Sequence, residues 1–199
     1  MNKTILLATN NSHKVEEIKN ALTKYDLDYD VLTLKDLNVK KEPIEDGETF
    51  YDNALIKASF YKKMFPQYLV LADDTGLLVD FLNGKPGVHS KRYSAPYATP
   101  KKNRKKLLLE LNGVDNRNAH FETVMVFIDQ DNNVHSFTGA TYGMILDHEE
   151  GSNGFGYDAL FYSTEINKPF GLITLDEKNQ ISHRGRALDK FASYLKEKS

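Results

Sequence analysis

The sequence has 199 residues, a formal net charge of −2, and neither cysteine nor tryptophan. The absence of cysteine excludes disulfides, zinc–thiolate sites, iron–sulfur clusters and a catalytic thiol. A near-neutral charge argues against a general nucleic-acid binder, which normally carries a large basic excess. Hydrophobic residues at 40% and charged residues at 27% exclude wholesale disorder. We therefore expect residues 1–199 to form one large domain or two intimate lobes.

No apolar run approaches the roughly 20 residues that span a bilayer. The apolar stretch Ile5–Ala8 is also too short for the core of a signal peptide, and polar Thr9-Asn10-Asn11 follows it. We expect a soluble, cytoplasmic protein with no membrane partner and no nucleic-acid partner.

The first part of the chain alternates predicted strands and helices. Thr4–Ala8 is an apolar run typical of a strand covered on both faces, and a second strand is expected within 29–34. Apolar residues between them recur at helical spacing: Val15, Ile18, Leu22 and Tyr25. A second helix is expected from Thr49, which forms a capping-box pattern with Asp52, to just before Pro66.

A third strand is expected at Tyr68–Ala72, ending abruptly at Asp73-Asp74. Thr99-Pro100 then forms a favourable start for a helix, and Asn112-Gly113 marks the end of that helix.

The last part of the chain combines a hairpin with a helical end. Two β-rich runs, 120–128 and 134–142, flank a polar turn and predict a hairpin. A capping pattern at Thr174-x-x-Glu177 opens the final helical region. Parallel-type strands together with a hairpin predict a mixed α/β sheet.

The segment Thr9-Asn10-Asn11-Ser12-His13-Lys14 joins the first predicted strand to the first predicted helix. A helix N-terminus offers backbone N–H groups and a partial positive charge, so the segment suits a phosphate group that Lys14 can reach. The Gly-x-x-x-x-Gly-Lys-Ser/Thr pattern of a P-loop is not present. The alternative is that Asn11 and Ser12 merely cap the helix and that Lys14 is solvated.

A second candidate group is acidic and consists of Glu42, Glu45, Asp73 and Asp74. Asp73-Asp74 follows a predicted strand, where open α/β sheets place their ligands. Magnesium commonly takes one or two carboxylates together with substrate phosphates. The alternative is an exposed turn, because Asp-Asp-Thr-Gly is also favourable turn chemistry.

A third candidate is the glycine-rich loop around Phe155, which stands between Gly154 and Gly156. Glycines let the backbone approach a ligand closely, and a phenylalanine fixed between them can offer a face for a planar ring. The alternative is an ordinary loop with Phe155 packed into the core.

Two basic segments complete the candidates. Lys178, with His183-Arg184 at or near a helix start, could donate hydrogen bonds to a carbonyl-bearing ring or to phosphates. The alternative for this group is a basic helix end on the surface. The run Lys101–Lys106 is more simply a solvated helix face than a nucleic-acid contact. Together, a phosphate-binding turn, metal carboxylates, a stacking loop and base-edge donors describe a nucleoside triphosphate site.

Several ordered motifs resemble the inosine triphosphate pyrophosphatase family, also called noncanonical purine NTP pyrophosphatases. They are the segments 9–14, 45–50, 53–58, 72–77, 86–94, 154–158 and 182–184. The resemblance implies an elongated mixed α/β sheet flanked by helices, with two lobes and an active-site cleft between them. It also implies a homodimer that uses Mg²⁺ to hydrolyse ITP, dITP and XTP to the monophosphate and pyrophosphate, which removes deaminated purines from the nucleotide pool.

The resemblance assigns phosphate and metal roles by motif. Residues Thr9 to Lys14 look like the triphosphate-binding turn, and Lys57 looks like a second phosphate contact. Glu45 and Asp74 match magnesium ligands. Asp74 also matches the residue usually assigned as proton acceptor, although Asp73 could take either role.

The resemblance also assigns residues around the base and along the cleft. Phe155 would stack on the base, within a loop that continues through Gly156 and Tyr157. Four residues would surround the base edge and the phosphates: Asp158, Lys178, His183 and Arg184. Three further residues match cleft-lining or hydroxyl positions: Thr75, Ser90 and Arg92.

The sequence departs from the family pattern at a few positions. Thr75 replaces a more usual serine, His89 and Lys91 are atypical, and Ala159 stands where the loop usually carries a proline. The alanine is expected to loosen the base-binding loop.

Three alternative functions stay open. A Maf-like nucleotide pyrophosphatase would prefer other bases, and a nucleotide sensor would bind without turnover. The Asp73-Asp74 pair argues against a sensor. An RNA-binding module would rest only on the Lys101–Lys106 run.

Overall fold

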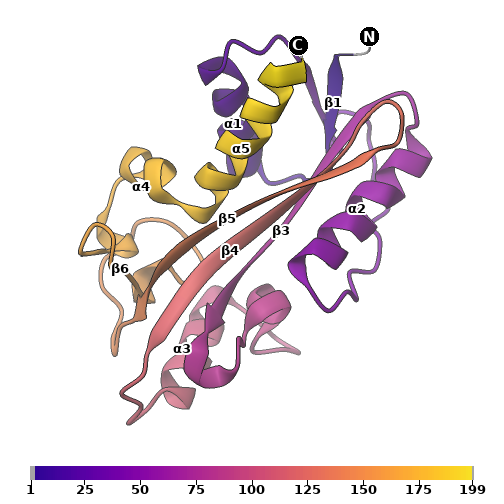
Figure 1. Ribbon diagram of the computed structural model, residues 1–199. Coiled ribbons are helices and arrows are strands. Elements are labelled where there is room, and N and C mark those ends of the chain that lie inside the picture. Colours follow the sequence, from indigo (N-terminus) through magenta and orange to yellow (C-terminus); the bar gives the residue numbers. More distant parts are fainter. Residues whose placement is uncertain (1–2, 199) are drawn as a thin grey trace. The chain divides into compact units, whose positions relative to one another are not determined.

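A computed structural model describes residues 3–198 and contains, within that range, a sheet in the order β2-β1-β3-β4-β5-β6-β7 (Figure 1). The strands are β1 (Thr4–Leu7), β2 (Asp30–Thr33), β3 (Leu69–Val79), β4 (Asn118–Ile128), β5 (Val134–Ile145), β6 (Phe161–Ser163) and β7 (Lys168–Pro169). The α-helices are α1 (Ser12–Lys24), α2 (Phe50–Met64), α3 (Pro100–Glu110), α4 (Leu175–Ile181) and α5 (His183–Lys198).

The sheet is mixed, as the sequence predicted. β1 pairs in parallel with β2 and β3, whereas β6 pairs antiparallel with β5 and β7. By internal contacts the chain forms two compact units. Unit 1 comprises 1–74, 123–139 and 184–199, and unit 2 comprises 75–122 and 140–183. The two lobes and the cleft between them stay predictions, as does the single domain.

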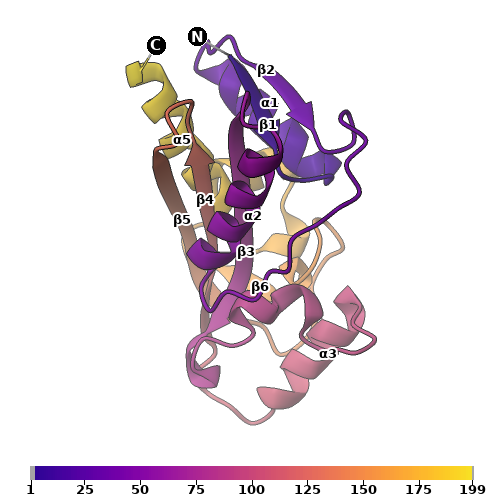
Figure 2. The ribbon, with the colours of Figure 1, turned by 90° about the vertical axis from the view of Figure 1, so that its right-hand side faces the viewer.

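Neighbouring side chains of β1, and that of Ala8 directly after it, enter two different hydrophobic clusters of unit 1. Ile5 and Leu7 pack with α1 and α5, whereas Leu6 and Ala8 pack with α2. Because successive strand residues point to opposite faces, α1 and α5 cover one face of the sheet in this unit and α2 covers the other (Figures 1 and 2). This double coverage explains why the β1 sequence is an uninterrupted apolar run.

The helix starts follow the predicted caps. The Thr49 side chain accepts from the backbone N–H of Asp52 in a full capping box, and Thr174 forms the same box with Glu177. Thr99 caps α3 ahead of Pro100. The predicted final stripe of Leu188, Phe191 and Leu195 is buried in the core of unit 1. Among the described residues, no helix has the length and apolar character needed to cross a membrane.

The prediction that a strand ends at Asp73-Asp74 is wrong, because β3 continues to Val79. The pairing of β1 with β3 ends near Leu71, whose carbonyl accepts from the N–H of Ala8. Beyond that point Leu77 and Val79 extend the strand into the core of unit 2. The two acids therefore lie in mid-strand, at the level where the parallel neighbour β1 stops. Ligands of open α/β sheets bind beyond the carboxyl ends of parallel strands, and the parallel strand that ends beside the two acids is β1.

Candidate active site

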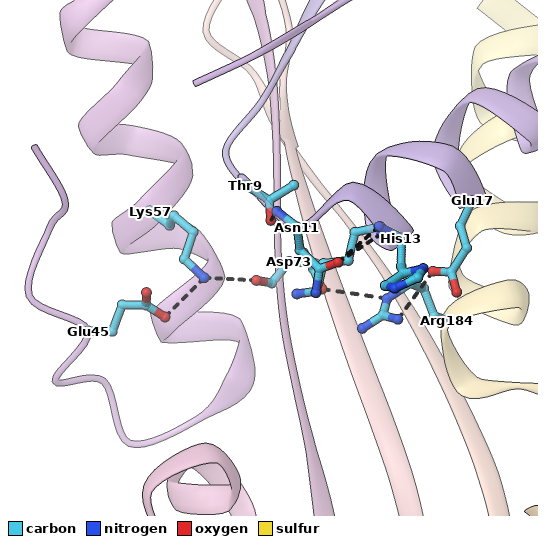
Figure 3. A network of polar contacts seen from close by, with 9 residues as sticks. Thr9, Asn11, His13, Glu17, Glu45, Lys57, Asp73 and Arg184 are labelled. Carbon is cyan, nitrogen blue, oxygen red and sulfur yellow. Dashed lines mark hydrogen bonds and ion pairs between the residues drawn. The ribbon is translucent and has the colours of Figure 1, made fainter. Parts of the chain in front are cut away.

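Three cationic side chains surround Asp73 in unit 1 (Figure 3). The Lys14 ammonium lies 2.7 Å from Oδ2 of Asp73, and Nε of Arg184 lies 3.8 Å from the same oxygen. Lys57 donates to the backbone carbonyl of Asp73 at 2.9 Å. These cations come from three elements that are distant in sequence: α1, α2 and α5.

The charges in this cluster shift each other's pKa values. Burial disfavours the charged form of Asp73, but Lys14, Arg184 and Lys57 outweigh it and hold the carboxyl pKa well below its usual range. Burial, assisted by repulsion from Arg184 and Lys57, lowers the pKa of the Lys14 ammonium, and the attraction of Asp73 opposes this only in part. Arg184 also pairs with Glu17 and Lys57 with Glu45, so the cluster is balanced in charge, and its cations are groups that the oxygens of a polyanionic ligand can contact in place of these acids.

The turn before α1 leads to Lys14, and its sequence allowed two interpretations, a phosphate-binding turn and a simple helix cap. Asn11 is the N-cap, because its side chain accepts from the backbone N–H groups of His13 and Lys14. Oγ1 of Thr9 accepts from the N–H of Asn11 at 3.2 Å. The capping interpretation is therefore right for Asn11, but a solvated Lys14 is wrong because its ammonium is paired with Asp73. The residues Asn10, Asn11, Ser12 and His13 are exposed.

The start of α5 is buried rather than a basic surface end. Arg184 is 5% exposed and His183 is 6% exposed. Nη1 of Arg184 pairs with Glu17 of α1 at 3.2 Å, and its Nε faces Asp73. This pairing fixes the guanidinium beside the carboxylate, since a planar fork needs partners in its own plane.

One buried amide connects the segments that carry Glu45 and Asp74. Nδ2 of Asn53 donates to Oδ2 of Asp74 at 3.0 Å, and its Oδ1 accepts from the N–H of Gly47 at 2.9 Å. A Cβ at Gly47 would lie 2.9 Å from Oδ1 of Asn53 and 2.5 Å from a neighbouring Cβ, so only glycine permits this approach. Glu45 itself pairs with Lys57 at 3.0 Å.

The acid residues fit a magnesium ion that also binds substrate. Within the described residues, no group of three or more histidine and acidic side chains is arranged as a protein-only metal site. Mg²⁺ usually keeps several waters and is held by one or two carboxylates plus substrate phosphates. In unit 1 the candidate donors are Asp74, which Asn53 contacts, and Glu45, two residues before the Gly47 that Asn53 also contacts. Glu42, by contrast, is exposed.

In unit 2 the glycine loop presents the Phe155 ring to the outside. The ring is 57% exposed, so the interpretation that it packs into the core is wrong. The Asp158 carboxylate accepts from the N–H of Phe155 at 2.8 Å and from the Lys178 ammonium at 2.5 Å. Lys178 also lies 4.9 Å from the centre of the Phe155 ring. A buried ion pair therefore supports the exposed ring.

Other predicted residues of unit 2 are mainly held by the backbone. The hydroxyl of buried Ser90 accepts from the N–H of Leu77, and the hydroxyl of Tyr157 donates to the carbonyl of Ser90 at 2.9 Å. His183 stacks on Phe121 at 4.9 Å between ring centres. The remaining two predicted residues are exposed Arg92 and half-buried Thr75.

A sequence model of the Ham1 family matches residues 5–194. The chain belongs to the Ham1 family. A protein of Thermoanaerobacter sp. strain X514 named dITP/XTP pyrophosphatase is 44% identical over 193 residues, covering 96% of each chain. A protein of the same name from Clostridium perfringens strain 13 is 43% identical, covering 98% of each chain. The Ham1 protein of Staphylococcus aureus has a TM-score of 0.91 at 34% identity, covering 99% of this chain and 100% of its own.

Ham1 membership confirms the family resemblance seen in the ordered motifs, and the solved Ham1 structures confirm the mixed α/β fold. A second solved relative, from Coxiella burnetii, also has a TM-score of 0.91, at 35% identity over 98% of each chain.

Sequence reasoning assigned no role to two contact-rich residues of this Ham1 chain, Asn53 and Arg104. The interpretation of Lys101–Lys106 as a solvated face is only partly right. Lys101, Lys102 and Lys105 are exposed, but Arg104 and Lys106 bind backbone carbonyls. Spacing along α3 could have signalled the partial burial of Arg104, because it lies three residues before buried Leu107 and so on the same face of the helix, whereas Lys102 and Lys105 lie five and two residues before Leu107 and face elsewhere.

Proposed function

We propose that this chain hydrolyses noncanonical purine nucleoside triphosphates, namely ITP, dITP and XTP, to the monophosphate and pyrophosphate. The observation that carries the proposal is the cluster of Lys14, Lys57 and Arg184 around Asp73, directly beside Asp74. The relatives named dITP/XTP pyrophosphatase support the same activity. Its effect would be to remove deaminated purines before polymerases incorporate them.

The cationic cluster would bind the triphosphate. Lys14 and Lys57 provide point charges on opposite sides of Asp73, and Arg184 adds a planar fork suited to phosphate oxygens. Since these groups are already ordered by their contacts with acidic residues, little reorganisation is needed when the developing charge appears on the phosphates.

Asp74 is the better proton acceptor of the two adjacent acids. The cations that hold the Asp73 pKa low make that carboxylate a poor base. In the proposed step, water oriented by Asp74 forms a bond to the α-phosphorus and gives up a proton. The bond from the α-phosphorus to the bridging oxygen breaks, and pyrophosphate leaves. Glu45 and Asp74 would hold Mg²⁺, which supplies charge neutralisation on phosphate oxygens.

Base selection would depend on donors that match a 6-oxo group. His183 and Arg184 are donors, and Phe155 offers a face on which a purine can stack. The amino group of adenine would meet such donors unfavourably and leave buried partners unsatisfied. The magnesium requirement, a homodimer and a cytoplasmic location complete this proposal.

The test is incubation with a panel of ITP, dITP, XTP, ATP and GTP in the presence of Mg²⁺, followed by product identification. We expect pyrophosphate and the matching monophosphate, with ATP strongly disfavoured. Equal turnover of ATP and ITP would contradict the proposal. Orthophosphate would indicate another phosphatase, preference for other bases a Maf-like enzyme, and no product a sensor.

The catalytic assignment has its own test. Asp74→Asn should lower kcat by about 10²–10⁴-fold, because the variant cannot accept a proton. Full pyrophosphate release by this variant at saturating Mg²⁺ would show that Asp74 is not the base.

A further inference from the structure

Arg104 of α3 connects this helix to the glycine loop of unit 2. Its Nη1 donates to the carbonyl oxygen of Gly156 at 2.8 Å. Its Nε and Nη2 donate to the two carboxylate oxygens of Glu149 at 2.9 and 3.1 Å. A bidentate pair of this kind fixes the guanidinium plane as well as its position. The Arg104 side chain is 18% exposed and that of Glu149 is 42% exposed, so the guanidinium is the better shielded partner of the pair.

The loop that Arg104 contacts needs support because its backbone is intrinsically permissive. Gly154 and Gly156 have φ of +76° and +63°, in the left-handed region that glycine adopts readily. The sequence also has Ala159 in this segment, and an alanine restricts the backbone less than a proline would. Two glycines on either side of Phe155 would let its ring take many orientations if nothing held them.

Hydrogen bonds hold three successive peptide groups of the loop around Phe155. On the N-terminal side, the Asp158 carboxylate accepts from the N–H of Phe155 and from the Lys178 ammonium. On the C-terminal side, the Phe155 carbonyl accepts from the N–H of Asp158 at 3.1 Å, and the Gly156 carbonyl, in the next peptide group, accepts from Arg104. Both peptide groups that flank the Phe155 Cα are therefore held within the loop, and Arg104 anchors the peptide group that follows them to α3.

We infer that Arg104, held in place by Glu149, is a positioning residue for base recognition: it fixes the Gly156 peptide and so presents the Phe155 ring ready for a purine. The inference rests on the proposed function, because it takes Phe155 as the face for the base. Ordering a loop during binding costs affinity, and a loop that is already ordered avoids that cost. Arg104 therefore contributes to binding of the nucleoside part and not to chemistry at the phosphates.

Steady-state kinetics with ITP separate these roles. Loss of one charge-assisted hydrogen bond predicts that Arg104→Ala raises KM by about tenfold, with kcat within about twofold of wild type. Arg104→Lys keeps the charge but cannot form the bidentate pair, so its KM should lie between those of wild type and Arg104→Ala. Lys105→Ala is the matched control, because it removes an exposed positive charge from the same helix. It should leave both constants unchanged.

Inorganic pyrophosphate provides a ligand without a base. Its inhibition constant against ITP hydrolysis should be the same for wild type and Arg104→Ala. A parallel tenfold rise in this constant would overturn the inference, since it would place the effect of Arg104 on phosphate binding.

Hydrogen exchange of the nucleotide-free protein tests the loop itself. Backbone amides of residues 153–158 should exchange at least several-fold faster in Arg104→Ala than in wild type or Lys105→Ala. Wild-type exchange and wild-type KM in Arg104→Ala would refute the inference. This measurement needs no turnover, so it stays decisive for the loop even if wild type fails to hydrolyse ITP and the proposed function is wrong.

Discussion

Replacing Asn53 by alanine tests whether one buried amide holds the two proposed magnesium ligands in place. Asn53 is 2% exposed and makes one hydrogen bond to the Asp74 carboxylate and one to the Gly47 N–H. A bond to a charged group contributes about 1.5–3 kcal/mol and a neutral one about 0.5–1.5 kcal/mol. Since Asp74 and Gly47 are partly exposed, water can replace part of the hydrogen bonding that Asn53 supplies to them. We expect a loss of about 2–3 kcal/mol in stability, or roughly 5–10 °C in Tm.

The positional role predicts a second effect, on metal binding. Residues that orient metal ligands typically contribute about 10–100-fold to metal affinity. Titration with Mn²⁺, followed by the paramagnetic resonance of the free ion, should therefore show affinity at least about tenfold weaker in Asn53→Ala.

Asn103→Ala is the matched control for this experiment. Asn103 is 4% exposed and also makes several hydrogen bonds, but within unit 2, to Ser94, Ser90 and Lys91. We expect a similar fall in Tm with unchanged Mn²⁺ affinity. If Asn53→Ala lost stability yet bound Mn²⁺ as tightly as wild type, the reasoning that links Asn53 to the metal ligands would be refuted.

Three further predictions concern unit 1. Lys57→Met should lower kcat/KM for ITP by about 10–100-fold through loss of a phosphate contact, and unchanged kinetics would exclude that contact. Gly47→Ala should cost about 1–3 kcal/mol in denaturant unfolding, because its Cβ would lie 2.5 Å from that of Asp52; a neutral change would mean that the turn adjusts freely. Burial disfavours the ionised form of Asp129, but hydrogen bonds led by those from Asn133 hold the pKa of this carboxyl below 3.8, its usual value. The ionised carboxylate therefore contributes fully to stability above pH 3.8, and this contribution is lost as the pH falls through the lowered pKa. Asp129→Asn should therefore be less stable than wild type at pH 7, and the difference should shrink by pH 3; a difference independent of pH would contradict the assignment.

Local rules account for most of the secondary structure. The capping residues Asn11, Thr49, Thr99 and Thr174 begin helices where the sequence placed them. Each of these starts depends on side chains within three residues of the cap, which a sequence displays directly. The β3 strand was misjudged at Asp73 because two adjacent acids are poor strand residues by local preference. The strand passes through them because distant cations stabilise the buried charge.

The candidate site was predictable in composition but not in its connections. Lys14, Lys57 and Arg184 were each identified from motifs, yet their convergence on Asp73 depends on how three helices pack against the sheet. The roles of Asn53 and Arg104 were not predicted, because the role of an amide or a guanidinium depends on the loop that it contacts in the fold. Nothing in the residues next to Arg104 indicates that its partner is a carbonyl in a glycine loop.

The division of unit 1 into three stretches of chain has a consequence for biosynthesis. Helix α5 belongs to the last of these stretches and is made after β1, α1, α2 and β3 have left the ribosome. It brings Arg184 to Asp73 and, through Phe191 and its neighbours, the apolar side chains that complete the core on one face of the sheet. Before α5 is made, a nascent chain can therefore bring only Lys14 and Lys57 to Asp73. The third cation and the finished core arrive together, so a partly folded molecule cannot display a complete anion site.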